Sequence, residues 1–200
     1  MLDTTSLGRY NANDTQVVQK EYIAVSGFRG GPAYWQRSAA NGGPVLYDWG
    51  AADWVKAYPF KGTKFATSPS SQGSVTQIWP GGILALSANG GQSKSGALWA
   101  TVATSGSAEG DPPVPGELHA LDAEDVSQEL WNSAMNPSRD GFGNFGKLVP
   151  PLVANGKVYV ATWSNQLRST DSSRSTRHCR HPWRLPGSHK AVRPAKPVSS

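Results

Sequence analysis

The chain has 200 residues, enough for one domain or two small ones, and its 22 glycines, 15 prolines and 8 tryptophans favour an all-β fold with many turns. Only 16% of its residues are charged, and no helical charge period runs along the chain, which argues against long surface helices. No run approaches about 18 apolar residues and the N-terminus lacks the apolar region of a signal peptide, so neither a membrane span nor a signal peptide is expected in this chain.

The formal net charge of +5 comes from one end of the chain. Residues 1–167 hold 11 basic and 13 acidic residues, whereas residues 168–200 hold 8 basic residues and one acid, Asp171. The charge therefore gives no reason to expect nucleic acid as a partner of residues 1–167.

Residues 1–26 lack β-like alternation, and we interpret them as an N-terminal segment or loop. From Gly27 to Leu167, short β-like runs alternate with turn clusters, at 33–35, 45–49, 54–60, 81–91, 96–104, 116–122 and 150–167. The clearest hairpin signal is Asn155-Gly156, which lies between two Val-rich runs and suits a type I′ turn. Residues 27–167 are therefore predicted to form a region of β repeats.

Residues 168–200 do not continue this pattern, although another apolar strand is due after Leu167. They are rich in Ser, Arg and Pro and too poor in apolar residues to pack, which predicts a disordered tail or the product of a shifted reading frame. Three histidines and Cys179 lie in this tail, but their spacing matches no zinc-finger pattern.

The β-like runs repeat loosely. Aligning residues 45–47, 97–99 and 157–159 places Tyr47, Trp99 and Tyr159 in equivalent positions, 52 and 60 residues apart. This spacing is somewhat above the ~40–50 residues of propeller blades and fits blades with loop insertions.

The stretch "GELHALDAEDVSQELW" (116–131) explains how such repeats would join. The small Ala120 allows two stacked sheets to approach closely, and Asp122 is suited to accept backbone N–H bonds in the following turn. The indole of Trp131, which buries roughly 150–250 Å² in such contacts, would then cover the neighbouring repeat.

Ala120, Asp122 and Trp131 together resemble the repeat of pyrroloquinoline-quinone-type (quinoprotein-like) β-propellers. In that family a strand ending Ala-x-Asp leads through a turn to a Trp that docks on the adjacent blade, although the usual Thr-Gly turn is absent here. The resemblance implies an all-β, partial β-propeller of about three four-stranded blades from a larger ring. It also implies a periplasmic or secreted parent protein, whose remaining blades would be this chain's partners.

Quinoprotein dehydrogenases bind pyrroloquinoline quinone and calcium and use an Asp base, and many carry a disulfide between adjacent cysteines. This chain has one cysteine and therefore no such pair. We expect a non-catalytic scaffold or binding module, with no catalytic residue, cofactor or metal in this chain and with a carbohydrate or protein as ligand. The alternative is a fragment of a quinone-dependent dehydrogenase whose catalytic residues lie in missing blades.

The acidic residues and two of the tryptophans are the side chains that could carry a binding function. The acidic residues are all in or beside turns and are interpreted as turn or capping carboxylates: Asp48, Asp53, Asp122, Glu124, Asp125 and Asp140. The cluster at 122–125 lacks the Gly and distal Glu of an EF-hand. Trp49 and Trp54 bracket one tight turn and are hard to bury together, so they are the candidates for stacking on a ligand such as a carbohydrate.

Overall fold

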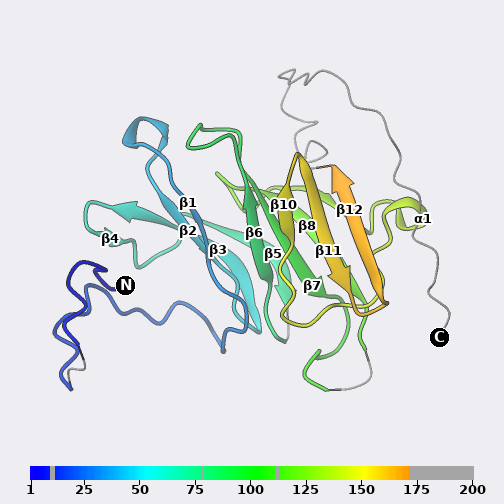
Figure 1. Ribbon diagram of the computed structural model, residues 1–200, viewed down its shortest axis with the longest axis horizontal. Helices are drawn as coiled ribbons and strands as arrows, with labels where there is room; N and C mark the ends of the chain where they lie inside the picture. The colour runs from blue at the N-terminus through cyan, green and yellow to red at the C-terminus, as the bar shows by residue number, and fades with distance from the viewer. Residues whose placement is uncertain (10–11, 78, 111–112, 172–200) are drawn as a thin grey trace.

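The computed structural model describes residues 1–9, 12–77, 79–110 and 113–171, so most of the expected tail lies outside the described residues. The described chain is all-β, as predicted. It consists of three antiparallel sheets placed one beside the next, none of them closed on itself (Figure 1).

Sheet 1 contains five strands in the order β1-β2-β3-β4, with β5 paired to β3. Its strands are β1 (Ala33–Trp35), β2 (Val45–Asp48), β3 (Asp53–Lys61), β4 (Lys64–Phe65) and β5 (Ser71–Gln77), and a short 3-10 helix, η1 (Ala39–Asn41), lies between β1 and β2. The sequence did not predict β5, because its residues are mostly polar or Gly and lack apolar alternation.

Sheet 2 is a four-stranded meander and sheet 3 a three-stranded one. Sheet 2 comprises β6 (Ile83–Ser87), β7 (Ala97–Ala103), β8 (Gly116–Asp122) and β9 (Glu129–Asn132); sheet 3 comprises β10 (Leu152–Ala154), β11 (Lys157–Thr162) and β12 (Gln166–Asp171). A one-turn helix, α1 (Pro137–Asp140), lies between them in sequence. The predicted hairpin is confirmed, since Asn155 and Gly156 both have positive φ between β10 and β11.

The start of the tail differs from the prediction. Strand β12 continues through Asp171 and pairs with β11 along its whole length, so residues 168–171 belong to sheet 3. Backbone hydrogen bonds make this pairing, and they do not require an alternation of apolar and polar side chains.

Each of the three sheets contains an equivalent cross-strand row of side chains. The aligned residues are Ala33, Tyr47, Ala57 and Ser71 in sheet 1, Ala85, Trp99, Ala120 and Trp131 in sheet 2, and Leu152, Tyr159 and Ser169 in sheet 3. In sheets 1 and 2 the aromatic residue is flanked by alanine on both sides. Because directly opposed side chains are only about 5 Å apart, small neighbours leave room for the ring to lie across the sheet.

Two apolar cores hold the sheets together. Tyr47 and Trp35 of sheet 1 pack with Leu98 and Val102 of sheet 2. On the other face of sheet 2, Trp99 and Trp131 pack with Val158 and Val160 of sheet 3. The first strands also meet, because β1 contacts β6 and β6 contacts β10.

The N-terminal segment covers the face of sheet 1 that points away from sheet 2. Val25 N–H donates to Asp53 Oδ2 at 3.0 Å, Lys56 Nζ donates to the carbonyl of Ile23, and Ala51 N–H donates to the carbonyl of Gly27. These polar contacts fix an extended segment on the sheet without making it a strand of that sheet.

Candidate functional site

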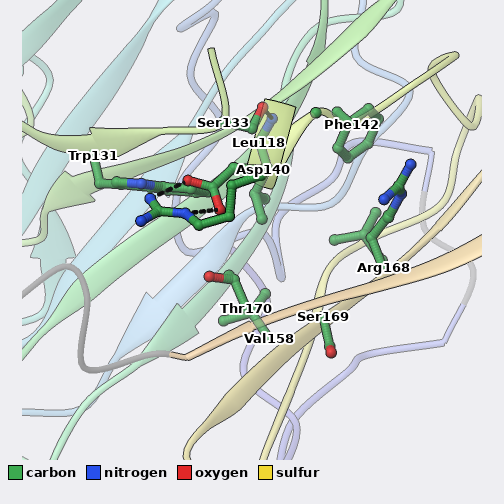
Figure 2. A pocket seen from close by; sticks show the side chains of 12 residues that line it. Leu118, Trp131, Ser133, Asp140, Phe142, Val158, Arg168, Ser169 and Thr170 are labelled. Atoms are coloured by element: carbon green, nitrogen blue, oxygen red, sulfur yellow. Dashed lines mark hydrogen bonds and ion pairs between the residues drawn. The ribbon is translucent and has the colours of Figure 1, made fainter. Parts of the chain in front are cut away.

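A crevice of about 80 Å³ lies between sheets 2 and 3. It is lined by Leu118 and Trp131 of sheet 2, by α1 and the residues that follow it, and by β11 and β12 (Figure 2). Figure 2 shows Trp131 and Asp140 on one wall, and Val158 and Thr170 on the strands opposite. We call this cavity the crevice below.

Trp131 forms much of one wall and has an unsatisfied donor. Its side chain is 7% exposed, and its Nε1–H has no hydrogen-bond partner among the described residues. The other buried indoles differ, since Trp35 donates to Gly90 O, Trp49 to Asp53 O and Trp99 to Ser87 Oγ. A buried N–H without a partner is uncommon and costs about 1–3 kcal/mol, so it marks a place where water or a ligand is expected.

The opposite wall supplies two further donors. Strand β12 pairs Thr170 with Val158 and Arg168 with Val160, and these valines face sheet 2, so both β12 side chains face the crevice. The hydroxyl of Thr170 is buried and has no partner among the described residues. Arg168 is exposed and forms no ion pair within the described part of the chain.

A charge pair on α1 lies beside Trp131 in the lining of the crevice. Arg139 donates through Nε and Nη2 to the two carboxylate oxygens of Asp140, at 2.8 and 2.5 Å. Asn136 caps α1 by accepting from Arg139 N–H, which fixes the start of this turn. Because Asp140 is neutralised by Arg139, the positive charge of Arg168 is left over.

The residues predicted to dock one repeat on the next occupy the two interfaces in different ways. Trp99 and Ala120 are fully buried between sheets 2 and 3, and Tyr47 is fully buried between sheets 1 and 2. Burial raises the pKa of the Tyr47 phenol, whose Oη donates to the carbonyl of Ala123. Tyr159 lies on the face of sheet 3 that points away from sheet 2 and is half-buried.

Asp122 acts as a turn residue, since its Oδ1 accepts a hydrogen bond from Glu124 N–H at 2.8 Å. Glu124 in turn forms an ion pair at 3.0 Å with Arg37, which lies between β1 and η1, is buried and stacks over Trp35. Asp125 accepts from the N–H and hydroxyl of Ser127. The acidic stretch 122–125 is thus occupied by its own turn and by the contact with sheet 1.

Trp49 and Trp54 do not form a common stacking surface. Trp49 is 3% exposed, packs in the core between sheets 1 and 2, and lies against Gly82, where an added Cβ would come within 2.6 Å of the indole. It is therefore placed for packing, whereas Trp54 is 37% exposed and points to the other face of β3. The sequence did not reveal that a glycine makes room for Trp49.

A buried charged group lies beneath the N-terminal segment. Burial would raise the pKa of Asp53, but hydrogen bonds from Lys56 Nζ and from the N–H groups of Trp54 and Val25 lower it below its ordinary value. Burial raises the pKa of Asp48 to about 7, with a further contribution from Asp53 that Lys56 opposes. Burial also raises the pKa of Tyr58 to about 12. Asp48 and Asp53 are therefore buried polar groups as well as residues beside a turn.

His119 is buried between two glutamates on the face of sheet 2 that carries Ala100 and Leu121. Its Nδ1 lies 2.5 Å from Glu129 Oε1, and its Nε2 lies 3.3 Å from Glu117 Oε2 without hydrogen-bond alignment. The hydrogen bond with His119 lowers the pKa of Glu129. No cluster of three or more His, Cys, Asp or Glu suited to a metal ion occurs in the described residues.

The sequence missed three polar residues that line the crevice. Arg168 and Thr170 fell in the presumed tail, and Arg139 belongs to no motif. The stretch 166–171 contains one apolar residue, Leu167, and therefore gave no alternation from which a strand could be predicted.

No protein-family model, no curated protein and no solved structure matches this chain. Within the described residues, no helix has the length and apolar character needed to cross a bilayer.

Proposed function

We propose that this chain is a segment of a quinoprotein-like β-propeller that serves as a non-catalytic scaffold or binding module in a larger, extracytoplasmic protein. The observation that carries the proposal is the shared cross-strand row, with its aromatic residue on the second strand of each sheet. Two of these aromatic residues contact the sheet that follows in the chain. Tyr47 meets sheet 2 and Trp99 meets sheet 3.

The meeting of the first strands supports a common axis. In a propeller, the first strand of each blade lies nearest the centre, so successive first strands are neighbours. Strands β1, β6 and β10 have this relationship, each contacting the next. The strand order within sheet 2, β6-β7-β8-β9, is likewise that of a four-stranded blade.

The free face of sheet 3 indicates what the segment would bind. Tyr159 occupies the position that is covered in the other two sheets, and beside it Leu152 and Leu167 are 63% and 72% exposed. An apolar sheet face of this kind is stabilised by burial against another sheet. The proposed occupant is a further blade of the parent protein, which makes the remaining blades the principal partners of this chain.

The test is association through that face. The chain should self-associate with increasing concentration in sedimentation velocity, because its own apolar face is the nearest substitute for a missing blade. The double variant Leu152→Lys, Leu167→Lys should remain monomeric. Tyr22→Lys, Val25→Lys removes two exposed apolar side chains from the N-terminal segment and should associate like the unmutated chain.

Two results would count against the proposal. One is that the unmutated chain stays monomeric and protease-resistant at every concentration. The other is equal association of the two double variants, which would locate the contact elsewhere.

A further inference from the structure

The crevice presents hydrogen-bond donors to a space in which the described residues offer them no acceptor. Trp131 Nε1–H and the Thr170 hydroxyl are both buried and unpartnered in that part of the chain. They lie on opposite walls, as Figure 2 shows. Two such donors facing one cavity favour an occupant that carries two acceptor oxygens.

The charges around the crevice favour an anion. Asp140 is paired bidentately with Arg139, so its negative charge is compensated. Arg168 at the mouth has no carboxylate partner in the described residues and stands beside Phe142 (Figure 2). Leu118, Phe142 and Val158 make part of the lining apolar, so the charge of Arg168 is compensated by few other polar groups of the lining.

The volume limits the size of that anion. A cavity of about 80 Å³ has room for a few atoms, since a water molecule occupies about 30 Å³ in the liquid. Drug-sized ligands need about 300–1,000 Å³ and are excluded. The apolar lining also accommodates a methyl group better than a fully hydrated inorganic ion.

We propose that the crevice binds a small organic acid of acetate size through its carboxylate. Trp131 Nε1–H and the Thr170 hydroxyl donate to the carboxylate oxygens, Arg168 compensates the charge from the mouth, and the short alkyl group rests against Phe142 and Val158. This inference goes beyond the proposed scaffold role and does not depend on how many further sheets the parent protein contains.

The indole N–H of Trp131 reports on binding directly. In ¹H–¹⁵N spectra of the full chain, with the Trp131 resonance assigned from Trp131→Phe, acetate added at constant ionic strength should shift that resonance to saturation. The indole resonances of Trp35 and Trp99, which already donate to protein oxygens, should move little. Acetamide, which is neutral and of similar size, should bind at least about tenfold more weakly.

Two variants test the assigned groups. Arg168→Gln and Thr170→Val should each weaken acetate binding, the former by about fivefold because the compensating charge at the mouth is lost, and the latter because a hydrogen-bond donor is lost. Lys94→Gln removes one exposed positive charge from the loop between β6 and β7, and this variant should bind acetate like the unmutated chain. If the spectrum of Arg168→Gln loses its dispersion, that variant is unfolded, and the acetate affinity of Thr170→Val alone tests the assigned groups.

The proposal is overturned if acetate produces no saturable shift of Trp131, in which case water alone fills the crevice. It is also overturned if chloride shifts the resonance as acetate does, or if Thr170→Val and Lys94→Gln bind acetate equally.

Discussion

The rings of Trp99 and Trp131 lie with their centroids 6.3 Å apart and their planes tilted by 59°, across the fully buried Ala120. Trp99 and Trp131 are the cross-strand neighbours of Ala120 on β7 and β9. A methyl group is therefore all that the two indoles leave room for, and this small residue sets how closely sheet 3 approaches sheet 2.

We expect Ala120→Leu to lower the free energy of unfolding by about 1–3 kcal/mol, because the larger side chain must displace one of the two indoles. Urea unfolding followed by tryptophan fluorescence measures the loss. Ala161→Leu makes the same chemical change at an exposed position of β11 and should change stability by less than about 0.5 kcal/mol. Equal midpoints for the two variants would refute a tightly packed interface at Ala120.

Asp48 should make stability fall as the pH rises toward neutrality. Its pKa of about 7 in the folded chain lies above its ordinary value of 3.8, so the folded state holds this proton when the unfolded state has released it. The free energy of unfolding should therefore decrease between about pH 4 and about pH 7. Lys56, Asp53 and Tyr58 share this environment, and Asp53 stays ionised in that range because its own pKa is lowered.

Asp48→Asn removes this titration and should make the chain more stable than the parent above about pH 7, by an amount that approaches 1.4 kcal/mol for each unit of pKa shift. Denaturant unfolding at several pH values measures the profile. Glu21→Gln alters an exposed carboxylate and should keep the parent's slope. An Asp48→Asn profile parallel to that of the parent would show that Asp48 titrates normally.

Glu129 should contribute in the opposite pH direction. Its folded pKa is lowered by the hydrogen bond with His119, so its stabilisation is present above about pH 4.5 and is lost as the pH falls through the lowered value. We expect Glu129→Gln to be less stable than the parent at neutral pH and to show a shallower loss on acidification. Acid titration monitored by circular dichroism, with Glu109→Gln as the exposed control, decides whether the slope changes.

The fold class followed from the sequence because it depends on local patterns. Turn residues such as Asn155-Gly156 specify their own backbone geometry, and alternation within a few residues marks a half-buried strand. The sequence predicted equivalent positions for Tyr47, Trp99 and Tyr159, and the register places each of them on the second strand of its sheet, in an equivalent cross-strand row. Strand β5 was not predicted, because its pairing is specified by β3 and not by its own composition.

The crevice was decided by the tertiary structure alone. Trp131 and Thr170 are 39 residues apart in the chain and face each other only because sheet 3 packs on sheet 2. Likewise, the burial of Trp49 depends on Gly82, and the pKa of Asp48 depends on its burial beside Asp53 and Lys56. The sequence by itself determined where strands and turns form, since these obey local rules. Which polar groups lose their water was settled by contacts between distant segments, because desolvation depends on everything that surrounds an atom.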